Sequence, residues 1–157
     1  MNNFKKSIMD DVVKLSIENV ENGGGPFSAA IVRNGEIIAT GANRVTATHD
    51  PTAHAEVMAI RNACEKLNTY DLSDCTIYSS CEPCPMCLGA IYWARIPVLF
   101  YGNTKQDAKD INFDDSFIYD ELAKKPEDRK LKMVKIDNSG AIKAFRLWES
   151  KDDKTLY

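Results

Sequence analysis

Residues 80–95 read SCEPCPMCLGAIYWAR, and a shorter stretch, PTAHAE, lies upstream of them and ends at Glu56. The two stretches supply two thiolates, from Cys84 and Cys87, and one imidazole, from His54. Three such ligands leave one position of a tetrahedral zinc ion open to water, which is typical of a catalytic rather than a structural zinc site. Glu56, two residues after the histidine, is then placed to carry protons beside the metal. The pattern therefore predicts a catalytic Zn²⁺ site.

Cys81 leaves two other metal sites open, because it forms a second C-x-x-C pair with Cys84. A closed structural zinc site, with His54 and all three cysteines as ligands, would leave no position for water. An iron–sulfur cluster is the other alternative, but the bacterial ferredoxin run needs a fourth cysteine where this chain has Ile91. Neither site explains Glu56 beside the histidine or the prolines on both sides of Cys84. We therefore expect a catalytic site that does not use Cys81.

Both halves of the expected site lie where a helix should begin. Pro85 follows Cys84 at the helix position that tolerates proline best. His54 and Glu56 are two residues apart, which on a regular helix turns their side chains about 200° from each other, so they converge on one ion only at a helix start. Helix N-termini also carry unpaired N–H groups and a positive dipole end, which favour thiolates.

The whole chain has the composition of one ordinary globular domain, with 157 residues, 44% hydrophobic and 27% charged. That length suffices for a sizeable core, so we expect a single domain over residues 1–157. The net charge of −3 lacks the basic excess that an extended nucleic-acid footprint needs. We therefore expect no nucleic-acid partner.

Neither a targeting peptide nor a membrane span is expected. The most apolar stretch, residues 88–100, is interrupted by Arg95 and Pro97 and is shorter than the roughly 20 residues that a membrane span needs. Near the N-terminus, Asp10 and Asp11 stand where a secretion signal needs an unbroken apolar core. The five cysteines, three of them within seven residues, fit metal binding in a reducing compartment better than a disulfide framework. A cytoplasmic location follows as the expectation.

Hydrophobic periodicity predicts alternating helices and strands. Helices are expected over residues 4–22, 53–67, 85–95, 113–123 and 141–156. Strands are expected over residues 27–33, 36–40, 75–79, 96–101 and 131–136. The Asn34–Gly35 dipeptide between the first two strands is a strong hairpin signal. This order predicts an α/β protein, a three-layer α/β/α sandwich with a mixed five-stranded sheet.

Four segments resemble the cytidine deaminase-like superfamily, in which H-x-E and P-C-x-x-C form the zinc deaminase signature. They are NGGGPFSAAIV (22–32), HDPTAHAEVMAIR (49–61), the opening stretch (80–95) and FDDSFIY (113–119). Over nearly its whole length the chain is similar to the family of bacterial guanine deaminases. The resemblance implies Zn²⁺-dependent hydrolytic deamination of guanine to xanthine and ammonia, with Glu56 as the proton carrier. The tRNA adenosine deaminases share an HDPTAHAE-like run, so that run does not decide the substrate.

The same resemblance implies a set of substrate-binding residues. Phe27 would lie against the purine, Asn43 would hydrogen-bond its edge, and Asp115 would accept from N–H groups of guanine. Trp93, just after the ligands, and Tyr157, the last residue, are further features shared with guanine deaminases and would complete the pocket. Plain structural roles stay open: Phe27 in the core, Asn43 in a turn, Asp115 in a helix cap and Tyr157 in a frayed end.

The resemblance also implies a homodimer in which the final helix crosses to the partner subunit. The expected partner is then a small purine base in purine metabolism, with neither nucleic acid nor a membrane. Two kinds of alternative stay open. One is a deaminase of guanosine, cytosine, a pterin-like ring or tRNA adenosine. The other is a zinc-stabilised binding module without catalysis, which the third cysteine motivates.

Overall fold

The computed structural model describes residues 4–157, within which the chain divides into two compact units. The first unit extends to Tyr119, and the second is Asp120–Tyr157. Helix α6 (Ser116–Ala123) spans the boundary between them. The single domain expected over residues 1–157 stays a prediction.

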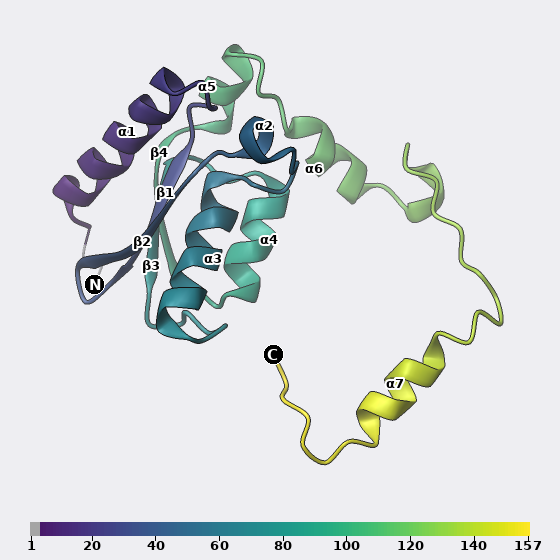
Figure 1. Ribbon diagram of the computed structural model, residues 1–157. Helices are drawn as coiled ribbons and strands as arrows, with labels where there is room; N and C mark the ends of the chain where they lie inside the picture. Colours follow the sequence, from purple (N-terminus) through teal and green to yellow (C-terminus); the bar gives the residue numbers. More distant parts are fainter. Residues whose placement is uncertain (1–3) are drawn as a thin grey trace. The chain divides into compact units, whose positions relative to one another are not determined.

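Within the described residues, the first unit is built on a mixed sheet of four strands in the order β2-β1-β3-β4 (Figure 1). The strands are β1 (Ser28–Arg33), β2 (Glu36–Ala42), β3 (Thr76–Cys81) and β4 (Val98–Asn103). β1 pairs antiparallel with both β2 and β3, and β4 pairs parallel with β3. The β1–β2 hairpin turns at Asn34 and Gly35, both with positive φ, as that dipeptide predicts.

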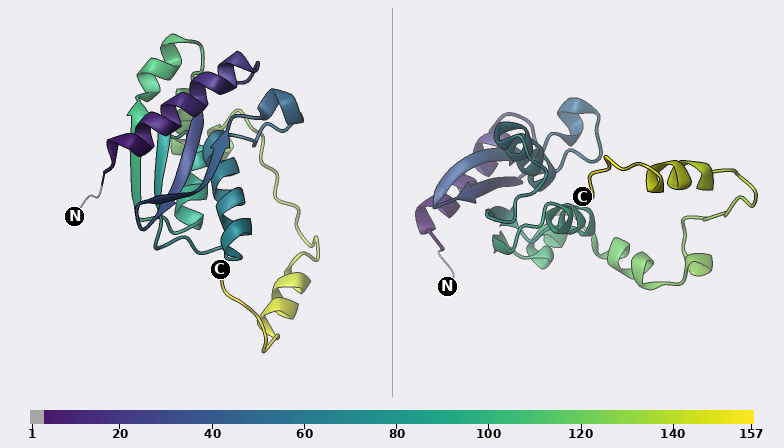
Figure 2. Two further views of the ribbon diagram at one scale, coloured as in Figure 1. Left: turned by 60° about the vertical axis from the view of Figure 1, so that its left-hand side comes forward. Right: turned by 90° about the horizontal axis from the view of Figure 1, so that it is seen from below.

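Helices cover both faces of this sheet (Figures 1 and 2). On one face lies α1 (Lys6–Glu21), whose Ile8 packs with Tyr78 of β3. On the other face lie α3 (Ala55–Leu67) and α4 (Pro85–Trp93), side by side. The first unit thus has the three layers, α/β/α, that the sequence predicts.

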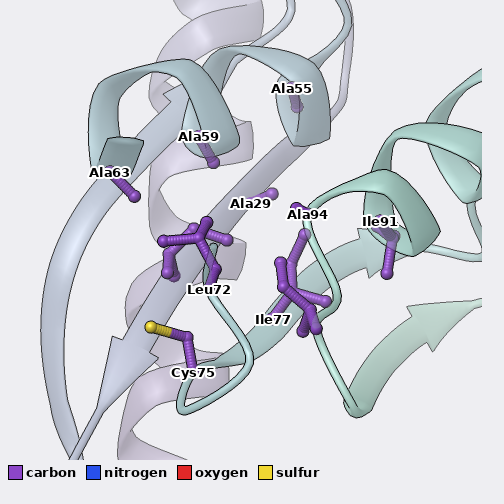
Figure 3. Packing of buried hydrophobic residues seen from close by; sticks show 11 residues of the cluster. Ala29, Ala55, Ala59, Ala63, Leu72, Cys75, Ile77, Ile91 and Ala94 are labelled. Atoms are coloured by element: carbon purple, nitrogen blue, oxygen red, sulfur yellow. The ribbon is translucent and has the colours of Figure 1, made fainter. Parts of the chain in front are cut away.

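The larger core lies between the sheet and the pair formed by α3 and α4 (Figure 3). Its buried members are Ala29, Ile31, Ala55, Ala59, Ala63, Leu72, Cys75, Ile77, Ile91, Ala94 and Ile96. The three members from α3 are all alanines, so this helix presents small side chains to the sheet and lies close to it. A close, fully buried contact of this kind fixes the position of the helix that follows His54.

Gly41 in β2 makes the close approach of α3 to the sheet sterically feasible. A Cβ atom at Gly41 would overlap the carbonyl oxygen of Ala55 and the amide nitrogen of Ala59. Both are backbone atoms of α3, so Gly41→Ala should push the helix away from the sheet. We expect the free energy of unfolding to fall by about 1–3 kcal/mol, the range for an overpacked core, as measured by chemical denaturation.

Gly89→Ala is the matched control for this substitution. A Cβ atom at Gly89, inside α4, meets no atom within 4 Å, and alanine is the better helix former. The control should leave stability unchanged or raise it. Equal losses of stability in the two variants would contradict the steric explanation for Gly41.

The fifth strand predicted over residues 131–136 is wrong, because this segment is irregular in the structure. Its apolar residues are interspersed with lysines, but Leu131, Met133, Val134 and Ile136 are each more than half exposed. A strand needs a neighbouring strand to pair its backbone groups, and a sequence pattern does not show whether one exists. The sheet formed by the described residues therefore has four strands instead of five.

The remaining helices are α2 (Val45–Thr48), α5 (Lys105–Asp110), a 3₁₀ turn (Pro126–Asp128) and α7 (Ile142–Glu149). α5 was not expected from periodicity, but it begins with a capping box in which Thr104 and Asp107 exchange hydrogen bonds. α7 is shorter than the helix predicted over residues 141–156. Among residues 4–157, none of the helices combines the length and the apolar character needed to cross a membrane.

Candidate active site

The three predicted metal ligands meet at the N-terminal ends of α3 and α4. His54 is the residue before α3, and Cys84 is the residue before α4. The Nδ1 atom of His54 lies 3.6 Å from the Sγ atom of Cys84 and 3.5 Å from that of Cys87. The three ligand atoms lie within 4.8 Å of one another, and no other group of this kind occurs in residues 4–157.

This group fits a zinc ion. Zinc binds thiolate sulfur at about 2.3 Å and imidazole nitrogen at about 2.0 Å in tetrahedral geometry, which places the nitrogen and the sulfur about 3.6 Å apart. Both observed nitrogen–sulfur distances agree with that value. Two thiolates and an imidazole also suit the borderline-soft character of zinc. His54, Cys84 and Cys87 are therefore able to hold a zinc-type metal and to leave its fourth position to another ligand.

In the metal-free protein, the pKa values of the two cysteines are shifted in opposite directions. A hydrogen bond from the Cys87 thiol, supported by one from His54, lowers the pKa of Cys84 to about 4. The same bond to Cys84, together with burial, raises the pKa of Cys87. The hydrogen bond with Cys84 also raises the pKa of His54. Binding of a metal to both thiolates must displace the Cys87 proton, so we expect metal binding to release protons.

Glu56 lies in the first turn of α3, beside the ligands, and is only 6% exposed. The Oγ atom of Ser79 donates a hydrogen bond of 3.0 Å to its Oε1 atom. Burial raises the pKa of the Glu56 carboxyl, and hydrogen bonds with Cys87 and Ser79 act in the opposite direction. A carboxyl whose pKa moves toward neutrality can both accept and donate protons, as general acid–base catalysis requires.

Glu56, His54 and Cys84 line a cavity of about 570 Å³. The other lining residues are Gly23, Gly24, Gly25, Phe27, Asn43, Val45, Thr46, Cys81, Glu82, Lys105, Ala108, Asn112, Phe113, Asp114, Asp115, Phe117 and Ile118. Three of the predicted substrate-binding residues, Phe27, Asn43 and Asp115, are thus brought to the same cavity as the ligands. Its volume is within the range of small-molecule sites.

Local contacts hold Phe27 and Asn43 in place, and burial acts on Asp115. The ring of Phe27 packs edge-on against that of Phe113, with the ring centroids 5.0 Å apart. The backbone N–H of Asn43 donates to the carbonyl oxygen of Phe27 at 3.0 Å, which joins the two segments. Burial, and then the charge of Cys84, raises the pKa of Asp115. In such a partly desolvated position, a carboxylate makes stronger hydrogen bonds than it does in water.

Asn19 and Ser79 support the site, although no sequence pattern indicated them. The Nδ2 atom of Asn19 donates to the carbonyl oxygens of Gly25, at 2.7 Å, and of Asn43, at 3.1 Å. Asn19 therefore ties α1 to the two segments that carry Phe27 and Asn43. Ser79 contacts Glu56 across 23 positions of the chain. Contacts between separate elements follow from packing and not from a local spacing, so no motif contains them.

Trp93, another predicted substrate residue of the first unit, is not among the residues that line this cavity. Trp93 is the last residue of α4 and is 70% exposed, and Tyr157 ends the second unit. Cys81 does line the cavity but lies outside the group of metal ligands. Its Sγ atom donates to the carbonyl oxygen of Thr104 at 3.6 Å, and burial raises its pKa to about 11. The Cys81 thiol thus has a backbone partner of its own, apart from the three ligand atoms.

Comparison with known proteins agrees with these features. A family model described as the cytidine and deoxycytidylate deaminase zinc-binding region matches residues 2–103. The guanine deaminase of Bacillus subtilis (strain 168) is 48% identical over 153 residues, which cover 97% of this chain and 98% of that protein. An X-ray structure of guanine deaminase from Bacillus subtilis has a TM-score of 0.94 at 48% identity, covering 100% of this chain and 99% of that chain.

Other similarities are less complete. The structure of a guanine deaminase from Nitrosomonas europaea has a TM-score of 0.69 at 35% identity, covering 73% of this chain and 67% of that chain. Solved structures with bound 2,6-diaminopurine and 8-azaguanine are 38% and 37% identical, with TM-scores of 0.67, and cover 69% of this chain and 61% and 63% of theirs. The tRNA-specific adenosine deaminase of Aquifex aeolicus (strain VF5) is 46% identical over 81 residues, 52% of this chain and 54% of that protein. With most of its length matched by the family model and nearly all of it by a deaminase relative, the chain belongs to the zinc-binding cytidine and deoxycytidylate deaminase family.

Proposed function

We propose that this protein is a guanine deaminase, a hydrolase that converts guanine and water to xanthine and ammonia, with Zn²⁺ as its cofactor. The choice of guanine as the substrate rests on the length of the sequence match to a guanine deaminase. The similarity to the tRNA-specific deaminase of Aquifex aeolicus spans 52% of the chain, whereas that to the guanine deaminase of Bacillus subtilis spans 97%. Cavity-lining residues such as Phe113 and Asp115 lie beyond the zinc-binding region, and of these two matches only the longer one is long enough to include both them and that region.

His54, Cys84 and Cys87 would hold the zinc ion. A zinc ion bound there would act as a Lewis acid and lower the pKa of water from 15.7 toward about 7. The two thiolates balance the charge of Zn²⁺, and the N-termini of α3 and α4 offset negative charge that develops beside it. The zinc site is proposed on the nitrogen–sulfur distances of 3.5 and 3.6 Å.

Glu56 would move the protons of the reaction. Its carboxylate takes the two protons of the water that attacks C2 of guanine one after the other, and it delivers the first to a ring nitrogen and the second to the leaving amine. One group performs both tasks because burial moves its pKa toward neutrality. Cleavage of the C2–N bond releases ammonia, and the water oxygen becomes the 2-oxo group of xanthine.

The carboxylate of Asp115 would accept hydrogen bonds from the N–H groups of guanine, with Asn43 and Phe27 beside the base. Adenine has no N–H at N1, so it would leave a carboxylate at this position unpaired. Asp115→Asn should therefore reduce kcat/KM for guanine by about 10- to 100-fold, the value of a hydrogen bond to a charged group. Zinc content should not change, because Asp115 is not a ligand. Steady-state assays of ammonia release, with metal analysis of the same samples, measure both quantities.

The neighbouring carboxylate provides the control for this variant. Asp114 accepts hydrogen bonds from the backbone N–H and the hydroxyl of Ser116, so it caps α6. Asp114→Asn keeps an acceptor for that cap and should change kcat/KM for guanine by less than about 3-fold, within the range of a minor polar change. Equal losses in the two variants would mean that the charge of the cavity, and not a direct contact from Asp115, selects the base.

The proposed activity is tested by ammonia release from guanine, guanosine, cytosine, adenine and tRNA, together with zinc analysis of the purified protein. Release from guanine at a rate well above that from the other four supports the proposal. If ammonia were released faster from one of the other four compounds, that compound would be the substrate instead of guanine. Bound zinc with no release from any of the five would favour the zinc-stabilised binding module.

We also infer a homodimer in which the second unit, Asp120–Tyr157, packs on the partner subunit and brings Tyr157 to the partner's cavity. All residues of this unit are described, and none of them is buried. Its large exposed apolar residues are Leu122, Leu131, Met133, Val134, Ile136, Ile142, Phe145, Leu147, Trp148, Leu156 and Tyr157. Exposed apolar surface on this scale is typical of an interface. Trp93, on α4, is 70% exposed and would belong to the same interface.

Mixing two inactive variants tests the exchange. Glu56→Gln lacks the proton carrier, and deletion of Tyr157 removes the residue that would complete the partner's cavity. In a mixed dimer, the intact Glu56 of one subunit would meet the intact Tyr157 of the other, so one working site of two should reappear. We expect activity to return to about a quarter of the wild-type level after refolding of an equimolar mixture, since random pairing makes half of the dimers mixed. No recovery in a mixture that light scattering shows to be dimeric would count against the exchange.

We further propose a cytoplasmic location. All five cysteines lie in the described residues and are free thiols. A site that depends on two thiolates is preserved in a reducing compartment and is exposed to oxidation elsewhere.

A further inference from the structure

Ser79 is the one side chain of β3 that is hydrogen-bonded to Glu56 within the described residues. Its Oγ atom donates to the Oε1 atom of Glu56 at 3.0 Å. The serine is 1% exposed and the glutamate 6%, so water does not compete freely for this bond. A buried pair of this kind has a fixed geometry, whereas an exposed pair exchanges with solvent.

The position of Ser79 in the sheet is rigid. Its backbone pairs with Ala29 of β1 on one side and with Tyr101 of β4 on the other. Because Ser79 lies on an inner strand, its hydroxyl starts from a point that is fixed by two neighbouring strands. Glu56, in contrast, extends from the first turn of a helix through a side chain with three rotatable bonds. The serine therefore supplies the fixed end of the contact and the glutamate the movable end.

The next residue, Ser80, has a different partner. Its Oγ atom accepts a hydrogen bond of 3.0 Å from the backbone N–H of Ser28. Successive side chains of a strand point to opposite faces of the sheet, so Ser79 faces the layer of α3 and α4 while Ser80 faces away from it. Two adjacent buried serines thus have separate tasks, and only one of them contacts the acid–base residue.

We propose that Ser79 is a positioning residue that holds the Oε1 atom of Glu56 and so fixes the orientation in which the carboxyl group meets water and substrate. This inference rests on the proposed deaminase activity. A proton carrier that acts several times in one turnover must present the same oxygen at the same place each time. Rate losses of about 100-fold follow from misplacement of a catalytic group by about 1 Å. Substrate binding does not depend on that oxygen, so the loss should appear in kcat and not in KM.

Two substitutions of equal shape isolate the hydrogen bond. Ser79→Thr keeps the hydroxyl and adds a methyl group, while Ser79→Val has the same shape without the hydroxyl. Any misfit caused by the added methyl group is common to both, so their difference reports the hydrogen bond alone. We expect kcat with guanine to be about 10- to 100-fold lower in the valine variant than in the threonine variant, the range for a misplaced catalytic group. KM and zinc content should agree within about 2-fold, since neither quantity involves the misplaced oxygen.

Ser79→Ala and Ser80→Ala give the matched control pair. The first should lower kcat without raising KM, and the second should lower the melting temperature while kcat stays near the wild-type value.

Equal kcat values for the threonine and valine variants would overturn the inference. Loss of zinc from the valine variant would also overturn it, because Ser79 would then support the metal site instead. If the wild-type protein releases no ammonia from guanine, the proposed activity itself fails. If the wild type is active and the valine variant is equally active, only the role of Ser79 fails.

Discussion

Glu56→Gln should retain zinc and the native fold but lower kcat for guanine by about 10²- to 10⁴-fold, the contribution of general acid–base catalysis. Glutamine has nearly the same shape as glutamate, and its carbonyl oxygen can still accept the hydrogen bond from Ser79. Its amide cannot take a proton from water at neutral pH. Steady-state ammonia release, zinc analysis and circular dichroism on the same preparation test the three parts of this expectation. Activity near that of the wild type would remove Glu56 from the reaction.

The stability of this variant provides an independent control. Burial raises the pKa of Glu56 in the folded, metal-free protein, so the folded state binds the proton more tightly than the unfolded state, whose carboxyl pKa is about 4.3. The glutamate therefore favours folding most below the unfolded pKa, and this contribution is lost as pH rises through the folded-state pKa. Metal-free Glu56→Gln should gain stability relative to wild type as the pH rises above about 4.3, the unfolded-state value. A relative loss of stability above that pH would mean that the ionised carboxylate is stabilised in the folded protein.

The part of the site that could be predicted from the sequence is the part that local structure determines. His54 and Cys84 each stand immediately before a helix, and the residues that mark a helix start lie next to one another in the chain. Cys87 follows within the first turn of α4. A short motif therefore contains both the ligand and the geometry that directs it, and only the meeting of the two helix starts depends on the tertiary fold.

The remaining features depend on contacts between separate elements. Asn19 reaches Asn43, and Ser79 reaches Glu56, through side chains that no periodic spacing relates. The apolar residues of segment 131–136 suggest a strand, yet whether the segment pairs depends on a neighbouring strand elsewhere. Hydrophobic patterns thus predicted β1 to β4, which pair in one sheet, and were wrong about a segment that lies outside that sheet.

Cys87→Ser should abolish stable zinc binding and, with it, the release of ammonia from guanine. Cys87 is fully buried, and its Sγ atom lies 3.5 Å from the Nδ1 atom of His54. A serine hydroxyl is of similar size but does not ionise near neutral pH, so the site would lose one of its two thiolates. Removing a residue that only hydrogen-bonds to a metal ligand already weakens metal binding by about 10- to 100-fold. Removing a ligand itself should therefore weaken metal binding by more than about 100-fold. Zinc content after dialysis against a weak chelator, with activity measured in parallel, tests this expectation.

Cys81→Ser distinguishes an open zinc site from a closed one. Cys81 is also buried and also lines the cavity, but it lies outside the group formed by His54, Cys84 and Cys87. If those three residues are the whole protein ligand set, the Cys81 variant keeps its zinc under conditions in which the Cys87 variant loses it. If Cys81 is a fourth ligand, both variants lose zinc alike, and no position remains for water at the metal. Retention of zinc and activity in Cys81→Ser, beside their loss in Cys87→Ser, would therefore establish the open coordination that hydrolysis requires.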